Sequence, residues 1–200
     1  SGTIILATGF SLYDPAKENE YSYNDSDDII TTFELEKMLR AGPLKTSSGT
    51  VPETVVMVLC VGMRGDPHEY CSRFCCMNAI SEARRIKEMH PDTRIYILYQ
   101  DIRAFGYYEK EYKELQGMGV KLIRYSPENR PIVTDMQSVL VRSLFLDEDL
   151  EIPADMVVLS VGAVPPKDSE RLRLLAKVGR SKSGFYQERH LKLAPLDTVS

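Results

Sequence analysis

The stretch Val55-Val-Met-Val-Leu-Cys-Val61 is the longest unbroken apolar run in this chain of 200 residues. Four of its seven residues are valine, whose branched side chain favours extended backbone. A run of this length predicts a strand buried on both faces of a parallel sheet. It is far shorter than the roughly 20 apolar residues of a membrane-spanning helix, so we expect no membrane insertion.

Helices and strands alternate after this run. Apolar residues recur every three positions from 72 to 90 and stop at Pro91, which predicts a long amphipathic helix. Residues 94–99 read as the next strand, 108–116 as a charged helix and 120–125 as a further strand. The order strand, helix, strand, helix, strand predicts an α/β domain with right-handed βαβ crossovers and a parallel sheet.

The flanking segments extend this prediction. Residues 3–6 read as a strand that ends in the turn Ala7-Thr8-Gly9, and Thr31 with Glu34 fits a capping box that begins a short helix. Residues 14–28 have no periodicity and predict a long surface loop.

The second half adds strands of another kind. Residues 138–146 alternate, 147–151 form an acidic turn, and 156–161 form another buried strand. We expect an antiparallel β appendage, a meander at the sheet edge, and closing loops and short strands after it.

Composition and net charge limit the classes of protein and partner to be expected. With 43% hydrophobic residues the chain can bury a real core. Its net charge of −4, without a basic cluster, makes nucleic acid an unexpected partner. No charged-then-apolar leader opens the sequence, which predicts a cytoplasmic protein. The start at Ser1-Gly2, without Met, suggests an excised fragment.

The four cysteines, Cys60, Cys71, Cys75 and Cys76, all lie within 17 consecutive residues. Such a tight cluster, in a chain without a secretion signal, predicts a metal site or reactive thiols rather than disulfides. Cys71 and Cys75 would share one helical face, with Cys76 rotated by about 100°. Cys60 ends the buried strand, beside the amino end of the following helix, so all four sulfurs could meet there.

The spacing Cys-x10-Cys-x3-Cys-Cys does not identify the metal. It is neither the ferredoxin pattern nor two zinc-binding Cys-x2-Cys arms. An iron–sulfur cluster, structural zinc and metal-free thiols all remain open at this point.

Five short motifs carry a family resemblance. They are Ala-Thr-Gly-Phe at 7–10, Cys-Val-Gly-Met-Arg at 60–64, Tyr-Cys-Ser-Arg-Phe-Cys-Cys-Met at 70–77, Asp-Ile-Arg-Ala-Phe-Gly at 101–106 and Leu-Ser-Val-Gly at 159–162. Together they resemble the A subunit of heterodisulfide reductase, a flavoprotein of thioredoxin-reductase-like fold that carries FAD and iron–sulfur clusters in multisubunit complexes of anaerobes.

The resemblance implies roles for particular residues. Cys60, Cys71, Cys75 and Cys76 match cysteines that bind a 4Fe-4S cluster in that family. The turn formed by Ala7, Thr8 and Gly9 resembles one that contacts the flavin dinucleotide through backbone N–H groups.

Departures limit what can be carried over. Ser81 stands where the family commonly has a lysine, and the interval between Cys60 and Cys71 is shorter than expected. No Gly-x-Gly-x-x-Gly follows a strand, so NAD(P) is not expected, and a cluster takes its place. The closing flavin-contacting segment is missing, so we expect most of the FAD site to be absent.

We therefore predict a flavin-domain-derived segment and linker at 1–50, a βαβ iron–sulfur core at 51–165 and closing elements at 166–200. The chain would be an electron-transfer domain of an oxidoreductase, inactive alone and bound to other subunits of a heterodisulfide reductase-like complex. Arg64 or Arg73 would tune the cluster. The alternative is a non-enzymatic docking scaffold with structural zinc or metal-free cysteines.

A few further side chains are less decisive. Asp101 and Arg103 form either a ligand site or a salt bridge, and His68 is expected to be a solvated loop residue. The pairs Tyr21/Tyr23 and Tyr107/Tyr108 are either a partner interface or packed surface aromatics.

Overall fold

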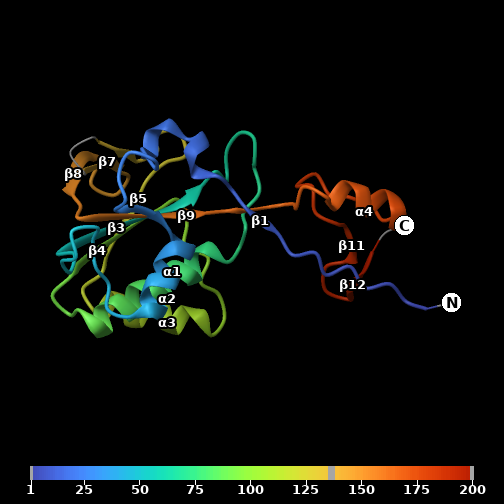
Figure 1. The fold of residues 1–200 in the computed structure, drawn as a ribbon, viewed down its shortest axis with the longest axis horizontal. Helices are drawn as coiled ribbons and strands as arrows, with labels where there is room; N and C mark the ends of the chain where they lie inside the picture. The colour runs from blue at the N-terminus through green and yellow to red at the C-terminus, as the bar shows by residue number, and fades with distance from the viewer. Residues whose placement is uncertain (1, 135–137, 199–200) are drawn as a thin grey trace.

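A five-stranded parallel sheet forms the centre of the computed structural model, which describes residues 2–134 and 138–198 (Figure 1). The strand order is β2 (Ile29–Thr31), β9 (Met156–Val161), β3 (Thr54–Val61), β4 (Arg94–Tyr99) and β5 (Lys121–Arg124). Every neighbouring pair is parallel. The predicted parallel α/β architecture is confirmed, and the quoted run is its central strand.

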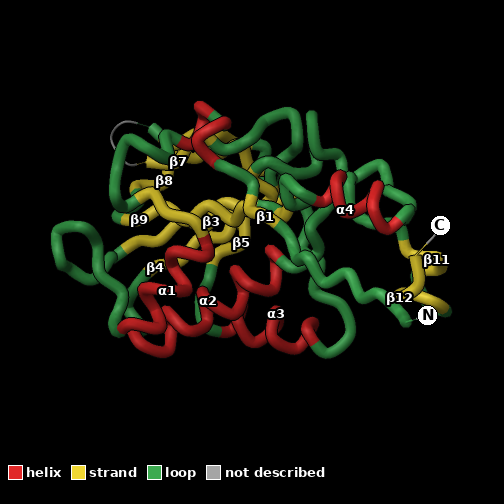
Figure 2. The backbone as a smooth tube through the Cα atoms, turned by 45° about the vertical axis from the view of Figure 1, so that its right-hand side comes forward, coloured by secondary structure: helices red, strands yellow, loops and turns green. Residues whose placement is uncertain are grey.

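Three helices cover one face of this sheet (Figure 2). They are α1 (Thr32–Ala41), α2 (Cys75–Met89) and α3 (Tyr108–Gly117). Because side chains alternate along a strand, Val55, Met57 and Leu59 of β3 point into this helical layer and are fully buried.

An antiparallel sheet covers the opposite face. It consists of β6 (Ile132–Val133), β7 (Ser138–Ser143) and β8 (Glu148–Pro153), and its apolar residues pack against Val56 and Val58 of β3. The prediction of a meander at the sheet edge is therefore wrong about its position. The central strand is apolar on both sides, and the meander buries the side that the helices leave uncovered. The predicted acidic turn at 147–151 is also wrong, since most of it belongs to β8.

The capping box that begins α1 is confirmed. Thr31 Oγ1 accepts a hydrogen bond from the Glu34 N–H, and Glu34 Oε2 accepts one from the Thr31 N–H at 2.6 Å. The loop at 14–28 contains two short 3-10 helices, Pro15–Lys17 and Asn19–Tyr21, and carries Tyr21 into the core with no exposed surface. Tyr21 is thus a core residue and not a partner contact.

The chain leaves the sheet through two short strands, β1 (Ser11–Leu12) and β10 (Ala163–Val164), which pair antiparallel. We call residues 10–164 the body. Residues 2–9 and 165–198 form the lobe, which contains α4 (Ser169–Ala176), β11 (Glu188–His190) and β12 (Ala194–Thr198) (Figure 1).

Two predictions fail in the lobe. Residues 3–6 are extended but join no strand ladder, and Ile4 and Ile5 are largely exposed. Helix α4 lies where only loops and short strands were expected. Segment 1–50 contributes β2 and α1 to the body's sheet and core, and the division into three segments stays a prediction. Among the described residues, no helix combines the length and apolar character needed to cross a membrane.

Candidate metal centre

An irregularity in β3 decides which side of the sheet Cys60 faces. Val58 pairs with Leu159 and Val61 with Val161, so the register of β3 shifts against β9 between these positions, and Cys60 adopts a left-handed φ of 65°. Simple alternation would place Cys60 on the side of Val58. The extra residue instead turns it toward the helical layer, where it packs in the same cluster as Cys76.

Cys75 and Cys76 open helix α2, and both are buried. Cys75 Sγ lies 3.8 Å from the carbonyl oxygen of Val161, at the end of β9. Cys76 Sγ lies 3.6 Å from the carbonyl oxygen of Asp101, just past β4. The two thiols therefore sit at the carboxyl ends of the strands that flank β3, as the βα geometry predicts.

Cys71 lies on a loop, and the prediction that it stacks on Cys75 along one helix is wrong. The helix begins at Cys75, since Arg73 has a left-handed φ of 70° that breaks it. The loop is tied to β10 instead: Ser72 Oγ accepts from the Ala163 N–H at 2.8 Å. The Arg73 N–H donates to Cys71 Sγ at 3.3 Å, and this thiol is only half-buried.

The four thiols interact electrostatically. Burial raises the pKa of Cys60 to about 11 and that of Cys75 to about 12, and the neighbouring thiols add to both increases. Burial also raises the pKa of Cys76, while the backbone N–H of Arg103 opposes this. Burial thus favours the protonated thiols, and a metal bound there would have to displace these protons.

The possible metal donors at this place are the four cysteine thiols. All four cysteines are free thiols. Within residues 2–134 and 138–198, no three Cys, His, Asp or Glu side chains are grouped as around a single metal ion. His68 is half-buried rather than solvated: its Nδ1 lies 3.0 Å from the Gly62 carbonyl and its ring packs edge-on against Tyr13 and Tyr70.

Asp101 forms two salt bridges. Its carboxylate binds Arg64 at 2.6 Å and Arg124 at 2.9 Å, and the hydrogen bond from Arg64 is the main reason that its pKa is lowered. The charge of Arg103 makes only a smaller contribution to lowering the pKa of Asp101. Sequence reasoning missed Arg124, because the pairing depends on the neighbouring strand β5.

Ala7, Thr8 and Gly9 lie at a different place, in the link to the lobe. They line a cavity of about 160 Å³ together with Leu6, Pro165, Pro166, Ser169, Phe185 and Tyr186. Gly9 has a left-handed φ of 66°, as a tight turn requires.

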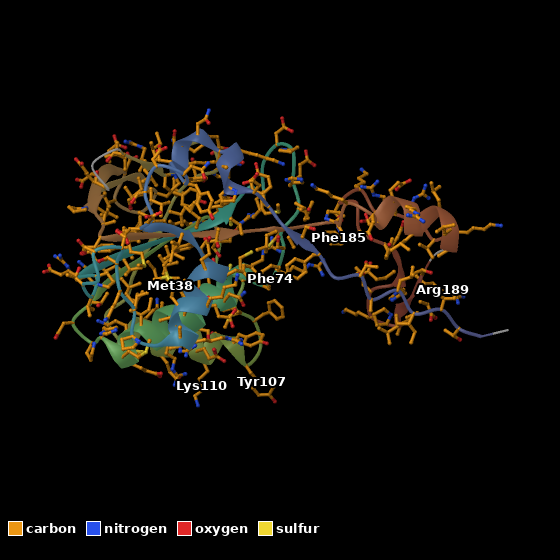
Figure 3. The ribbon with its side chains drawn as sticks, viewed as in Figure 1. Met38, Phe74, Tyr107, Lys110, Phe185 and Arg189 are labelled. Carbon is orange, nitrogen blue, oxygen red and sulfur yellow. The ribbon has the colours of Figure 1, made fainter. Side chains whose placement is uncertain are left out.

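An aromatic pair connects this turn to the cysteines, and sequence reasoning missed it. Phe10 follows Gly9 and stacks on Phe74, which precedes Cys75, with ring centroids 5.3 Å apart. Figure 3 shows Phe74 on the side of the body that faces the lobe. Tyr107 points outward in the same view, and its side chain is almost fully exposed. In the sequence, Phe10 directly follows Gly9 and Phe74 directly precedes Cys75. An aromatic residue next to each predicted site is the signal that could have suggested their contact.

No family model matches the sequence, but curated relatives do. The A subunit of an H2/formate:CoB-CoM heterodisulfide,ferredoxin reductase from Methanococcus maripaludis is 43% identical over 98% of this chain. The A subunit of the H2-dependent enzyme from Methanothermobacter thermautotrophicus is 42% identical over 100% of it. The iron-sulfur A subunit of the CoB–CoM heterodisulfide reductase from Methanocaldococcus jannaschii is 42% identical over 98%.

Over nearly its whole length, the chain is similar to a segment of these heterodisulfide reductase A subunits. The recognition made from the motifs is confirmed. The chain spans about a third of these relatives, 32% of each, which agrees with the expectation of a segment of a longer protein.

A solved structure supports the fold. A thioredoxin reductase from T. acidophilum superposes with a TM-score of 0.51 over 96% of this chain and 54% of its own, at 14% sequence identity. At that identity the likeness shows the fold alone, and it confirms the predicted thioredoxin-reductase-like architecture.

Proposed function

We propose that this chain is an electron-transfer segment of a heterodisulfide reductase-like oxidoreductase, holding a 4Fe-4S cluster on Cys60, Cys71, Cys75 and Cys76. One observation carries the proposal: a strand irregularity, a loop and a helix start bring four thiols to one end of the sheet. A bound cluster would accept and release one electron at a time.

The surrounding residues prepare this place for an anionic cluster. The amino end of α2 presents its free N–H groups and partial positive charge beside Cys75 and Cys76. The Arg73 N–H is directed at Cys71. Burial of Cys60, Cys75 and Cys76 keeps water away from three of the four ligands.

The flavin would be contacted at a separate place. In this proposal the backbone of Ala7, Thr8 and Gly9 contacts part of an FAD molecule. The cavity there, about 160 Å³, is smaller than the roughly 300–1,000 Å³ of ligand pockets, so this chain would hold only part of the FAD.

The longer relatives suggest the context. Their names mention ferredoxin and the CoB-CoM heterodisulfide, and describe each protein as one subunit of a reductase. We therefore propose that the chain works with the other subunits of such a complex, in the reducing cytoplasm of an anaerobe, where thiols remain available for iron.

Anaerobic reconstitution with iron and sulfide tests the proposal. We expect about four iron and about four sulfide ions per chain, and a broad visible absorption that dithionite bleaches. Protein that takes up zinc alone, without thiolate-to-iron absorption, would overturn it.

Substitution of the ligands tests the assignment of the four cysteines. Cys75→Ser and Cys76→Ser should each lose the complete cluster, because an alkoxide donor replaces thiolate poorly at iron. Asn78→Ser, one turn further along the same helix, is the matched control and should keep it. A complete cluster in both cysteine variants would contradict the ligand set.

A docking scaffold is the second candidate function. It is favoured by the apolar side chains that the lobe exposes, among them Leu175 at 71%, Leu193 at 84% and Leu196 at 95%. In that case the cysteines would hold zinc or no metal, and the same metal analysis separates the two candidates.

A further inference from the structure

Arg64 stands out among the cations near the cysteines, because its guanidinium is fixed in place. Its side chain is 21% exposed, and it donates to Asp101 Oδ2 at 2.6 Å. Its charge opposes the increase in the pKa of the Cys60 thiol that burial causes. Asp101, which anchors Arg64, also has its carbonyl oxygen 3.6 Å from Cys76 Sγ, so the guanidinium is held at the cysteine site. Arg64 itself has a left-handed φ of 61°, in the loop that follows the irregular end of β3.

The pair formed by Arg64 and Asp101 keeps a net positive charge. A single carboxylate would nearly cancel one guanidinium, but Asp101 is shared with Arg124, whose Nη2 lies 2.9 Å from Oδ1. Two guanidinium groups therefore face one carboxylate. The guanidinium beside Cys60 is the less exposed of the two, since the Arg124 side chain is 54% exposed.

Arg73 offers a direct contrast within the same site. It contacts Cys71 through its backbone N–H, and its side chain is exposed to solvent. A charge on a long exposed side chain is screened by water and salt, whereas a half-buried, anchored one is screened much less. Of the two arginines expected to tune the site, Arg64 is therefore the effective one.

We propose that Arg64, positioned by Asp101, fixes a positive charge against the Cys60 ligand and raises the reduction potential of the cluster held there. This inference rests on the proposed function. Reduction adds one electron to the cluster and breaks no bond and moves no proton, so the negative charge at the ligands increases. A cation held beside Cys60 stabilises that reduced state more than the oxidised one.

The test is a redox titration of the reconstituted chain, poised with dithionite and mediators and followed by electron paramagnetic resonance. Arg64→Met should shift the midpoint potential to a more negative value. We expect about a tenfold smaller reduced-to-oxidised ratio at a fixed poise, which corresponds to about 59 mV for one electron. Arg64→Lys should restore most of the potential, since it returns the charge.

Arg94→Met removes an exposed charge at the opposite end of β4; it is the matched control and should leave the potential unchanged. Arg73→Met should shift the potential less than Arg64→Met does. If Arg64→Met does not retain a cluster, Arg64→Gln removes the charge and keeps hydrogen-bond donors, and it should show the same negative shift. An unchanged potential after loss of the charge at position 64, or an equal shift in Arg73→Met, overturns the inference. Wild-type protein that forms no cluster would instead overturn the proposed function.

Discussion

The body and the lobe are built from the same kinds of element and differ in how well these are covered. In the body, every residue of β3 is buried between helices on one side and an antiparallel sheet on the other. In the lobe, one helix and one hairpin leave Leu193 and Leu196 almost fully exposed. The cysteines lie at the carboxyl end of the sheet, where β9 continues through β10 toward the lobe. The candidate centre is thus held by the part of the molecule that has its own core.

The same substitution made in both regions tests this difference most strongly. Leu59→Ala in β3 removes a side chain with no exposed surface and should cost about 3–4 kcal/mol of unfolding free energy. Leu193→Ala, at a residue 84% exposed in the lobe, should change it by less than about 0.5 kcal/mol. Anaerobic urea unfolding measures both, and similar losses in the two variants would remove the distinction.

A pair of glycines extends the comparison to backbone close to the cysteines. A Cβ at Gly62, where φ is +72°, would lie 2.1 Å from the ring of Tyr13, so Gly62→Ala should cost about 2–3 kcal/mol. Gly9, in the lobe, has a similar φ of +66° but open space around it, and Gly9→Ala should cost only about 1 kcal/mol. Equal costs in urea unfolding would show that backbone strain, rather than packing in the body, controls both positions.

Substitution of Glu82 should raise the unfolding free energy of the body, whereas the substitutions above lower it. This carboxyl is 8% exposed on α2, its Oε2 has no partner in the described part of the chain, and burial, with Glu36 nearby, raises its pKa from 4.5 to about 9. Between those values the folded state holds one proton more than the unfolded state, so stability falls as pH rises. Glu82→Met should therefore gain about 2 kcal/mol near pH 7.5 and much less near pH 5.

The lobe supplies the control for this substitution. Glu170 on α4 has a side chain 46% exposed and forms salt bridges with Arg173 and Arg180, and the hydrogen bond from Arg173 is the main reason that its pKa is lowered. Glu170→Met should therefore give no gain at any pH. Thermal or urea unfolding at the two pH values would contradict the argument if Glu82→Met showed no dependence on pH.

The elements that could be predicted from sequence are those with a local signal. Each of these signals is contained in a short stretch of neighbouring residues: the apolar run at 55–61, the three-residue repeat of α2 and the Thr31 capping box. Helix α4 was missed because two of its three leucines, Leu174 and Leu175, are largely exposed, so the helix has no buried stripe that would reveal it.

The candidate site was predictable in location but not in detail. The rule that ligands gather at the carboxyl ends of parallel strands placed the cysteines correctly. The loop position of Cys71 depends on the contact between Ser72 and Ala163, 91 residues apart, and the orientation of Cys60 depends on a register shift against β9. Contacts at such separations leave no periodic trace in the sequence.

Among the test substitutions, removing a helix N-cap should change the unfolding free energy least, and the body and the lobe each offer one N-cap residue to compare. In the body, the hydroxyl of Thr31 accepts from the Glu34 N–H, so Thr31→Ala should cost about 1 kcal/mol. In the lobe, Asp168 occupies the equivalent position before α4 but makes no side-chain cap bond, so Asp168→Ala should cost only a few tenths of that, about 0.3 kcal/mol. Hydrogen exchange of the first-turn amides resolves such differences helix by helix. Faster exchange in α1 of Thr31→Ala, with α4 of Asp168→Ala unchanged, is expected because only α1 has a cap to lose. The reverse pattern would mean that the lobe helix depends on its own local contacts more than the helix packed on the sheet does.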